Sequence, residues 1–496
     1  MAERAKTTSL AALGLTALKG RDAVISGLSV DSRDVKDGHL FAALPGSNVH
    51  GGEFIKYALR QGAGAILTDR AGLEMARTEI DAADVAVVLA QDPRQALAYA
   101  AALWFGAQPE TMIAVTGTNG KTSVATFTRQ IWTGLGLAAV NLGTTGIEGA
   151  YEAPLGHTTP EPITLHRALA RIAVAGVTHA AMEASSHGLA QRRLDGVSLA
   201  AAAFTNFSQD HLDYHADFDD YFDAKMGLFR RVLSEDGAAV VNIDDPRGAE
   251  VADIVLARGQ DLISVGRSQG AHLRISGQRY DATGQDLRFD WNGEPHQVRL
   301  NLIGGFQAEN VLVAAGLAIG AGAKVEAVFA CLRDLVTVRG RMQLAATRKN
   351  GASVFVDFAH TPDAVATALK SLRPHVLGRL IVVLGAGGDR DAAKRPLMGQ
   401  AACENADVVF VTDDNPRSED PFIIRRAVMQ GCPGATEVAD RAEAILRGVD
   451  ALQPGDALLI AGKGHETGQT IGDDVFPFDD VEQASVAVAA LDGRVT

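Results

Sequence analysis

The sequence predicts an α/β protein built from about three domains. Its 496 residues are too many for one hydrophobic core. Short apolar runs alternate with helical patterns along most of the chain, which indicates parallel sheets with helices on both faces. This alternation of apolar runs and helical patterns changes near residue 108 and again near residue 339. We therefore expect a small N-terminal α/β domain over residues 1–107, a central domain over residues 108–338 and a C-terminal α/β domain over residues 339–496.

The composition limits the classes of function. A formal net charge of -14 with no long basic stripe argues against nucleic acid as a partner. No uninterrupted apolar run is long enough to cross a bilayer, so we expect no membrane insertion. The three cysteines are far apart and show no paired spacing, which argues against disulfides and a zinc site and favours a reducing cytoplasm.

In the N-terminal region, the first 20 residues have a short apolar patch but no cleavage site, and they are expected to form a helix. The elements expected after them are a helix over 54–61, a strand over 63–68, a strand over 85–89 and a helix over 95–104. Two polar loops, Val30–Arg33 and Pro45–Gly52, are most simply turns when each is taken alone.

The central region begins with TMIAVTGTNGKTS over residues 111–123, which predicts a buried strand, a glycine turn and a helix from about Lys121. Gly117 and Gly120 permit a tight turn whose backbone N–H groups converge on an anion. Lys121 adds a positive charge, and Thr122 adds a hydroxyl that can meet a metal ion. The alternative is a structural strand–turn–helix with an incidental lysine. The strand before the turn and the helix after it favour a phosphate-binding loop.

Further elements of an α/β pattern follow this loop. In the central region they are strands over 138–142, 178–183 and 199–204, helices over 165–175 and 218–233, and an antiparallel hairpin over 273–300. In the C-terminal region they are strands over 354–358, 380–384, 408–411 and 457–460. A polar cluster follows each of these last four strands: HTPD, GAGGDRD, TDDNPR and AGKGHE. Since ligand groups gather beyond the carboxyl ends of parallel strands, we expect the four clusters to share one edge.

Two residues are candidate magnesium ligands. Glu183 ends a predicted strand, and His211 lies between Asp210 and Asp213 in NFSQDHLDYH. A carboxylate and an imidazole near Thr122 could hold Mg²⁺ that bridges phosphates. The alternative is that both residues simply cap strand ends. Their expected position in the sheet that carries the phosphate-binding loop favours the metal site.

Several other polar residues are open to two interpretations. Arg390 and Arg417 could each grip a carboxylate, or they could be solvated surface arginines. Glu466, in the turn GKGHE, could receive an ammonium group, or the turn could be a glycine-rich connection. Three further residues could form an anion contact or a solvated loop: Ser185, Gln191 and Arg193.

A set of motifs along nearly the whole chain resembles, in the right order, the motifs of the Mur ligase family: DSR, TGTNGKTS, HTTPE, MEASSHGL with QRR, NFSQDHLDYH, RGRM, DFAHTPD, GAGGDRDAAKRP, DNPR and GKGHE. The resemblance implies an N-terminal domain that binds a uridine nucleotide. It also implies a central ATP-binding domain with a P-loop-type parallel sheet, and a Rossmann-like C-terminal domain that binds an incoming amino acid.

The resemblance also implies an activity. It points to an ATP-dependent ligase that adds meso-2,6-diaminopimelate to the D-glutamate side-chain carboxylate of UDP-N-acetylmuramoyl-L-alanyl-D-glutamate, through an acyl phosphate, in peptidoglycan precursor synthesis. ATP and Mg²⁺ would be the cofactors, and the enzyme would be a cytoplasmic monomer that closes about hinges near Arg339–Gly340 and before Thr111. The alternatives are a lysine-adding Mur ligase, a folylpolyglutamate synthetase-like ligase and an ATPase switch that ligates nothing.

The resemblance assigns residues to five overlapping sets. The ATP set is Gly117, Thr118, Asn119, Gly120, Lys121, Thr122, Ser123, Asn310, Arg341 and Asp357. The UDP-dipeptide set is Val30, Ser32, Ser47, Asn48, Val49, His157, Thr158, Thr159, Ser185, Gln191 and Arg193. The diaminopimelate set is Arg390, Asp414, Asn415, Pro416, Arg417, Gly462 and Glu466. The catalytic set is Lys121, Glu183, His211 and Lys225, and the metal ligands are Thr122, Glu183, His211 and Lys225 as a carbamate.

Overall fold

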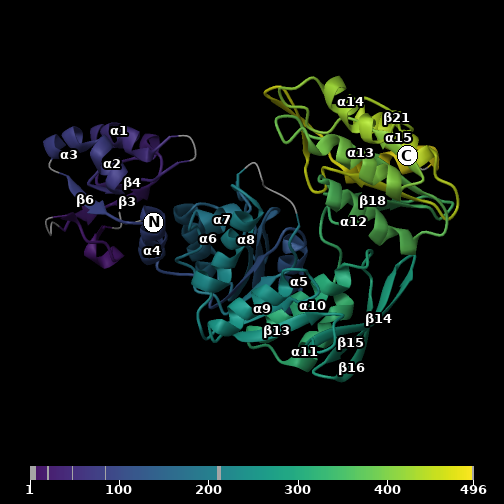
Figure 1. Ribbon diagram of the computed structural model, residues 1–496, viewed down its shortest axis with the longest axis horizontal. Helices are drawn as coiled ribbons and strands as arrows, with labels where there is room; N and C mark the ends of the chain where they lie inside the picture. The colour runs from purple at the N-terminus through teal and green to yellow at the C-terminus, as the bar shows by residue number, and fades with distance from the viewer. Residues whose placement is uncertain (1–6, 19–21, 47–48, 84, 209–213, 494–496) are drawn as a thin grey trace.

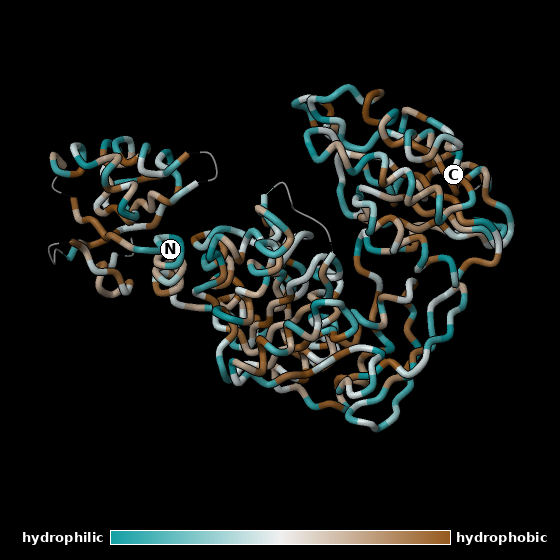
Figure 2. Tube along the Cα trace, in the orientation of Figure 1, coloured by the Kyte–Doolittle hydropathy of each residue, from teal (hydrophilic) through white to brown (hydrophobic). Residues whose placement is uncertain are grey.

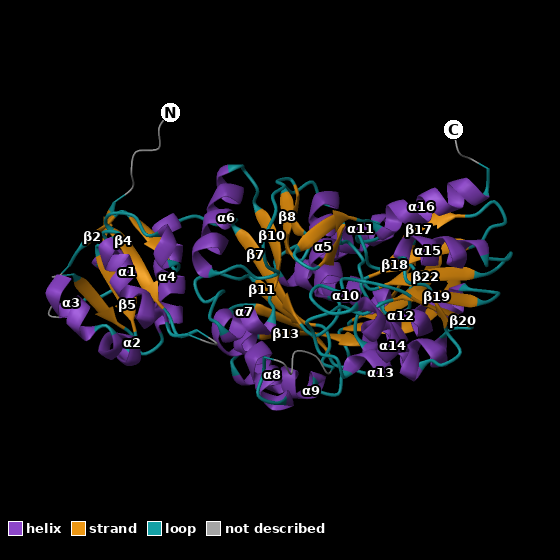
Figure 3. Cartoon of the chain, turned by 90° about the horizontal axis from the view of Figure 1, so that it is seen from above, coloured by secondary structure: helices purple, strands orange, loops and turns teal. Residues whose placement is uncertain are grey.

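The chain forms three lobes in sequence order, each with its own β-sheet (Figure 1). The computed structural model describes residues 7–18, 22–46, 49–83, 85–208 and 214–493. Figure 2 shows that the apolar segments gather inside each lobe, and Figure 3 shows the three sheets in a row. The expected α/β fold class is confirmed. Within the described ranges no helix is both long and apolar enough to cross a membrane.

The N-terminal lobe is a four-stranded parallel sheet in the order β3-β4-β5-β6. Its strands are β3 (Gly27–Ser29), β4 (His39–Ala43), β5 (Ala65–Thr68) and β6 (Ala86–Leu89), and its helices are α1 (Ile55–Arg60), α2 (Arg70–Met75), α3 (Arg77–Ala83) and α4 (Pro93–Phe105). Apolar residues of α4 pack on one face of the sheet, and those of α1 and α3 pack on the other.

The helix expected over the first 20 residues is wrong for the part that the structure describes. Strand β1 (Thr8–Ser9) pairs with β2 (Val24–Ile25), and a 3₁₀ turn over Ala11–Leu13 lies between them in the chain. Leu10 and Leu13 are almost fully buried against the sheet and α4. The apolar spacing therefore reflects tertiary packing, which overrides the local preference for helix.

The central lobe is a ten-stranded sheet in the order β16-β15-β14-β13-β12-β11-β7-β10-β8-β9. Its strands are β7 (Thr111–Thr116), β8 (Ala139–Gly143), β9 (Gly146–Gly149), β10 (His179–Glu183), β11 (Ala201–Phe204), β12 (Ala238–Asn242), β13 (Asp261–Gly266), β14 (Leu273–Asp281), β15 (Gly284–Trp291) and β16 (Glu294–Leu300). Strands β8 and β10–β14 run parallel with β7, whereas β9, β15 and β16 add antiparallel edges. The predicted hairpin is confirmed, with Asn292 and Gly293 at positive φ in its turn.

Helices cover both faces of this sheet. They are α5 (Lys121–Gly134), α6 (Pro162–Val174), α7 (Ser186–Ala190), α8 (Phe218–Gly227), α9 (Gly248–Ala257), α10 (Gln307–Gly320) and α11 (Val325–Cys331). Along β7, Ile113 and Val115 pack toward α5 and α10, while Met112 and Ala114 pack toward α6 and α8. Successive strand residues point to opposite faces, so a strand that is buried on both sides must be apolar throughout.

The C-terminal lobe is a six-stranded sheet in the order β17-β18-β22-β19-β20-β21. Its strands are β17 (Gln343–Thr347), β18 (Ser353–Asp357), β19 (Leu380–Leu384), β20 (Val408–Val411), β21 (Thr436–Glu437) and β22 (Ala457–Ala461), with a separate hairpin of β23 (Gly468–Ile471) and β24 (Asp474–Pro477). Its helices are α12 (Pro362–Leu372), α13 (Lys394–Asn405) and α14 (Pro421–Gly431) on one face and α15 (Arg441–Asp450) and α16 (Asp480–Leu491) on the other. Since β18, β22, β19 and β20 are parallel neighbours, the four polar clusters that follow them share one edge, as predicted.

The chain passes from the central to the C-terminal lobe over residues 339–341. Val338 is buried in the core of the central lobe, and Met342 is buried in the core of the C-terminal lobe. Gly340 lies between them with φ 67°, and a Cβ there would stand 2.2 Å from the backbone nitrogen of His465. This connection therefore packs directly on the turn that follows β22.

We expect Gly340→Ala to destabilise the protein more than Gly351→Ala does. Both glycines have positive φ, so each alanine carries backbone strain of about 1–2 kcal/mol. At Gly351 nothing lies within 4 Å of the added Cβ, whereas at Gly340 it meets backbone, which adds roughly 1–3 kcal/mol. The midpoint of thermal unfolding measures the difference. Equal decreases in the two variants would contradict the close packing at Gly340.

Candidate functional site

The phosphate-binding loop joins β7 to α5 in a tight turn. Gly117 has φ 146°, and a Cβ there would lie 2.0 Å from Thr205 Oγ1. Gly120 has φ 87° and precedes α5, and no side chain caps that end of the helix. The side-chain ammonium of Lys121 donates to the carbonyls of Gly117, at 2.9 Å, and Thr118, at 2.8 Å. The loop thus holds a cation beside the positive end of a helix, which favours an anion.

The segment after β11 braces this loop. Thr205 Oγ1 donates to the carbonyl of Asn119 at 2.6 Å, and Asn206 Oδ1 accepts from the backbone nitrogen of Asn119 at 2.8 Å. The carbonyl of Asn206 also accepts from the backbone nitrogen of Thr118 at 2.9 Å. Our sequence analysis did not single out Thr205 or Asn206. The sequence could have indicated them, because they directly follow a predicted strand, where ligand-binding residues of parallel sheets gather.

A cavity of about 800 Å³ opens over the loop, between the central and C-terminal lobes. The predicted residues that line it are Thr118, Asn119, Gly120, Lys121, Thr122, Ser123, His157, Thr158, Thr159, Glu183, Ser185, Arg193, Lys225, Asn310, Arg341, Asp357 and Arg390. Three of the expected sets, for ATP, dipeptide and amino acid, therefore contribute to one space.

Other predicted residues lie elsewhere or are not placed. Ser47, Asn48 and His211 fall outside the described residues. Val30, Ser32 and Val49 belong to the N-terminal lobe and do not line the cavity. Among the described residues, Gly117, Gln191, Asp414, Asn415, Pro416, Arg417, Gly462 and Glu466 also stand outside its lining.

Glu183 ends β10 beside the start of the loop, because it pairs in register with Val115 of β7. Its side chain is almost fully buried, and Oε1 accepts from the backbone nitrogen of Thr144 at 2.8 Å. Thr144 Oγ1 lies 3.3 Å from Glu183 Oε2 and 3.1 Å from Thr158 Oγ1. These contacts fix the carboxylate at the wall of the cavity.

Lys225 lies on α8 and is 1% exposed. Its ammonium donates to the carbonyl of Gly117 at 2.8 Å and lies 4.4 Å from the centre of the Tyr221 ring. Lys121 donates to the same carbonyl. Two lysines from different helices therefore meet beneath the phosphate-binding loop, and nothing in the local sequence around Lys225 predicts this.

The residues present fit a magnesium ion that is held largely by phosphates. Within the described part of the chain, no group of three or more His, Cys, Asp and Glu residues is placed to hold a metal. Mg²⁺ commonly takes only one or two protein oxygens together with substrate phosphates. The Thr122 hydroxyl and the Glu183 carboxylate line the same cavity and are oxygen donors of this kind.

The C-terminal lobe contacts the phosphate-binding loop through Arg341. Its Nη2 donates to Thr122 Oγ1 at 3.2 Å, and its guanidinium lies 4.7 Å from the centre of the Phe358 ring. Burial lowers the pKa of Arg341, and the charges of Asp357 and Glu183 oppose that shift. Burial likewise raises the pKa of Asp357, against the charge of Arg341. A guanidinium at this position can bind a phosphate oxygen and link the two lobes.

A network of side chains forms the wall next to Glu183. Thr159 Oγ1 donates to the carbonyl of Glu183 at 3.0 Å and accepts from the backbone nitrogen of Ser185 at 3.1 Å. Arg193 Nη2 donates to Gln191 Oε1 at 2.8 Å, so Gln191 orients a guanidinium that lines the cavity. Burial is the main cause that lowers the pKa of Arg193.

Beyond the strands of the C-terminal lobe, a polar cluster surrounds Lys463, which is fully buried. Its ammonium donates to Asn415 Oδ1 at 2.9 Å and to Glu466 Oε2 at 3.2 Å, and it lies 3.9 Å from Asp414 Oδ1. Asn415 Nδ2 also donates to Glu466 Oε2, at 2.9 Å. Our sequence analysis noted the motif GKGHE but selected Glu466 and not Lys463, because a lysine beside glycines carries no sign of its burial.

Two arginines border a glycine loop next to this cluster. A Cβ at Gly387 would lie 2.9 Å from Arg417 Nη1 and 3.9 Å from Arg390 Cγ. Arg417 has φ 52°, and its Nη1 donates to the carbonyl of Gly388 at 2.7 Å. Because Arg390 also lines the large cavity, the glycine loop connects that cavity with the Lys463 cluster.

We expect Lys463→Met to lower the midpoint of thermal unfolding and Glu466→Gln to restore part of the loss. The first change removes the cation between the carboxylates, at a cost of about 1.5–3 kcal/mol for hydrogen bonds to a charged group. The second change removes the negative charge of Glu466, which has lost its contact with the Lys463 ammonium in the first variant. A double-mutant cycle on the two positions measures the coupling. Strictly additive losses would mean that Lys463 and Glu466 do not interact energetically.

Comparisons with known proteins match the three lobes to three family models. The model for the Mur ligase family, catalytic domain, matches residues 24–104, the Mur ligase middle domain matches 115–318, and the Mur ligase, glutamate ligase domain, matches 340–464.

Two relatives that align along almost the whole chain have the same name. The chain is 50% identical to the UDP-N-acetylmuramoyl-L-alanyl-D-glutamate--2,6-diaminopimelate ligase of Bradyrhizobium diazoefficiens, over 94% of this chain and 95% of the relative. It is 47% identical to the ligase of that name from Caulobacter vibrioides, over 95% and 97%.

Solved structures agree with these matches. A ligase of the same name has a TM-score of 0.69 at 34% identity and covers 95% of this chain and 96% of its own. The folylpolyglutamate synthase of Mycobacterium tuberculosis in complex with ADP has a TM-score of 0.62 at 21% identity, over 82% of this chain and 95% of its own, and shows likeness of fold alone. Since family models match all three lobes and relatives align along almost the whole length, the chain belongs to the Mur ligase family.

Proposed function

We propose that the protein is an ATP-dependent, ADP-forming ligase that adds meso-2,6-diaminopimelate to the D-glutamate side-chain carboxylate of UDP-N-acetylmuramoyl-L-alanyl-D-glutamate. One observation carries the proposal. A single cavity of about 800 Å³ is lined by the phosphate-binding loop, by Glu183 and Arg193 of the central lobe, and by Arg390 of the C-terminal lobe. A triphosphate, an acidic acceptor and an amino acid can therefore meet in one place. The activity agrees with the name of the relatives that align along almost the whole chain.

The chemistry requires that the carboxylate be activated. A carboxylate does not acylate an amine at neutral pH, because its oxygen is a poor leaving group. Transfer of the γ-phosphoryl group of ATP to the D-glutamate carboxylate breaks the bond between that phosphorus and the β,γ-bridging oxygen and forms an acyl phosphate and ADP. The neutral amine of the amino acid then attacks the acyl carbon and forms the C–N bond. Inorganic phosphate leaves with the electron pair of the C–O bond, and the nitrogen releases one proton to solvent.

The phosphate-binding loop supports the first step. The ammonium of Lys121 and the uncapped start of α5 offset the charge of the transferring group. Arg341, which reaches Thr122 from the other lobe, adds a guanidinium at the same end of the nucleotide. When bound, Mg²⁺ would neutralise phosphate charge, and Thr122 and Glu183 would hold it, together with His211 and a carbamate on Lys225.

The acceptor site uses the wall next to Glu183. Arg193, oriented by Gln191, and the hydroxyls of Thr159 and Ser185 suit an anionic dipeptide. The N-terminal lobe would hold the UDP-sugar end through Val30, Ser32 and the loop at Val49. The acyl phosphate hydrolyses readily, so closure of the C-terminal lobe about residues 339–341 would exclude water from the cavity.

Selection of the amino acid uses charge in the C-terminal lobe. Three carboxylates (Asp414, Glu466 and Asp480) and two cations (Lys463 and Arg441) form one network, in which Glu466 is partly exposed and the other four side chains are buried. The network carries one net negative charge. That charge suits one ammonium group. Arg417 and Arg390 suit carboxylates. Diaminopimelate has one carboxylate more than lysine at its far end, and a guanidinium left without it disfavours lysine.

Release of inorganic phosphate tests the proposal. We expect release from ATP only when UDP-N-acetylmuramoyl-L-alanyl-D-glutamate and meso-diaminopimelate are both present, and little release with lysine in a panel of diamino acids. Equal rates with lysine would favour a lysine-adding ligase. Activity with folate and glutamate would favour a folylpolyglutamate synthetase. Release without any amino acid would favour an ATPase that ligates nothing, and each of these results would overturn the proposal.

We expect Arg417→Ala to remove most of the activity with diaminopimelate, by about 10²-fold or more in kcat/KM, because the lost contact is to a charged group. The KM for the UDP-dipeptide should not change. Arg426→Ala, which alters an exposed arginine nearby on α14, is the matched control and should retain activity. Steady-state kinetics with diaminopimelate and lysine measures the effect. Unchanged preference between the two amino acids in Arg417→Ala would refute the role of Arg417.

A further inference from the structure

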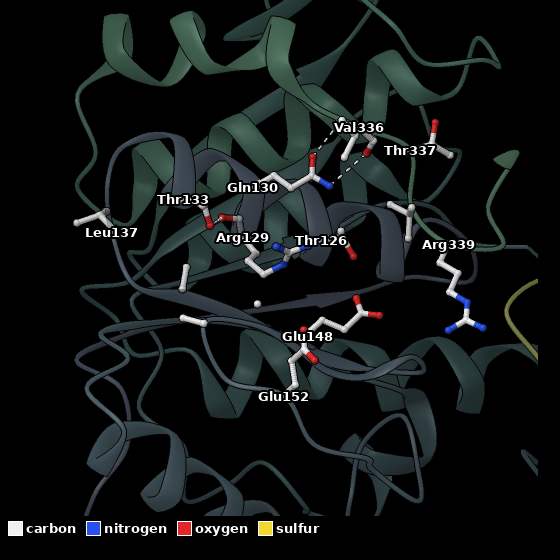
Figure 4. Close-up of a pocket in the computed structure, with 14 residues that line it drawn as sticks. Thr126, Arg129, Gln130, Thr133, Leu137, Glu148, Glu152, Val336, Thr337 and Arg339 are labelled. Atoms are coloured by element: carbon white, nitrogen blue, oxygen red, sulfur yellow. Dashed lines mark hydrogen bonds between the residues drawn. The ribbon is translucent and has the colours of Figure 1, made fainter. Parts of the chain in front are cut away.

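Residues 336–341, the interlobe segment, include the connection between the two lobes and contact helix α5 at two points. At the first, the side-chain amide of Gln130 pairs with the backbone of Val336. Gln130 Oε1 accepts from the Val336 nitrogen at 2.9 Å, and Nε2 donates to the Val336 carbonyl at 3.2 Å (Figure 4). At the second, Arg341 Nη2 donates to Thr122 Oγ1. Gln130 and Thr122 are eight residues apart, about 12 Å along the helix.

The backbone of the segment is held firmly between these two points. Val338 is 2% exposed and packs in the same core as Phe127 and Ile131 of α5. The backbone nitrogen of Arg341 donates to the carbonyl of Val338 at 3.0 Å. A shift of the segment along α5 would therefore move Arg341 relative to the phosphate-binding loop.

The amide of Gln130 is the polar attachment at the start of the segment, between Leu335 and Val338, which are both buried in the core of the central lobe. The side chain of Val336 is 62% exposed, so apolar packing does little to hold this residue. A cavity of about 670 Å³ lies beside it, lined by Gln130, Val336, Thr337 and Arg339 together with Arg129, Glu148 and Glu152 (Figure 4). Because Val336 borders open space there, the two hydrogen bonds of Gln130 fix its backbone on α5, in addition to the apolar packing of Leu335 and Val338.

We infer that Gln130 is a positioning residue that fixes the start of the interlobe segment on α5 and thereby places Arg341 at Thr122 in the ATP site. The inference rests on the proposed function in one respect, since it takes Thr122 and Arg341 as contacts of ATP. The inference gives a function to residues in the middle of α5. One face of this helix lies away from the ATP site and borders the cavity of about 670 Å³.

The variant Gln130→Met tests the inference, because methionine keeps the length of the side chain and removes both hydrogen bonds. We expect the Kd of a non-hydrolysable ATP analogue, and the KM for ATP, to rise about three- to tenfold, the effect of losing one or two net hydrogen bonds. The KM values for the UDP-dipeptide and for diaminopimelate should not change. An unchanged Kd for the analogue would overturn the inference.

The chain offers a matched control in Gln108. Its Nε2 donates to the carbonyl of Ser198 at 2.9 Å, and its Oε1 accepts from the Ser198 nitrogen at 3.1 Å, so it makes the same pair of bonds away from the interlobe segment. We expect Gln108→Met to leave the Kd of the analogue as it is in the unaltered protein. An equal rise in both variants would mean that general loosening of the lobe, and not the segment, sets the affinity.

A double variant shows whether the effect passes through Arg341. In the background of Arg341→Met, the further change Gln130→Met should leave the Kd of the analogue unaltered. A second rise of the same factor would show that Gln130 acts by another route. If the unaltered protein releases no phosphate with its substrates, the proposed function fails, and the Kd comparison of Gln130→Met with Gln108→Met still decides the inference.

Discussion

The carbonyl of Gly117 is the contact on which the site depends. Lys121 and Lys225 donate to it, at 2.9 and 2.8 Å, from helices on opposite faces of the central sheet. Two ammonium groups that share one acceptor repel each other, most strongly where water is excluded. Under the proposed function, a triphosphate in the loop would relieve that repulsion, and so would a carbamate on Lys225.

The backbone that presents this carbonyl can be formed only by glycine. A Cβ added at Gly117 would lie 2.0 Å from Thr205 Oγ1, and one added at Gly120 would lie 2.6 Å from Asn310 Oδ1. Both turns have positive φ, which L side chains rarely adopt. The loop is therefore rigid because it is tightly enclosed by neighbouring segments. A rigid loop pays little entropy when it orders around a phosphate.

The second constraint is that the cavity is shared between two lobes. Arg341 reaches Thr122 from the C-terminal lobe, and Gly340 beside it packs on the turn after β22. The connection is thus in contact with the phosphate-binding loop at one end and with the turn that carries Lys463 at the other. Under the proposed function, the nucleotide and the amino acid would bind at opposite sides of this short connection, which contacts both places.

The sequence by itself determined the α/β class, the tight glycine turn between β7 and α5, and the shared edge of the C-terminal clusters. These features are local: a glycine turn between a buried strand and a helix, or a polar cluster after an apolar strand, can be recognised within about ten residues. Glu183 could be predicted for the same reason, because it ends a strand beside the loop.

The family resemblance assigned Lys225 to the site, but only the tertiary structure showed which contacts such ordinary residues make. Lys225 meets Gly117 across 108 positions of sequence, and Gln130 meets Val336 across 206. Lys463 is buried among acceptors that come from two different strand ends. An exposed helical lysine or glutamine has the same local sequence pattern as one that makes such a contact. Burial and contact partners depend on segments that are distant in sequence and pack together only when the sheets form. The short strand in place of an N-terminal helix has the same cause, since Leu10 and Leu13 follow the packing against α4.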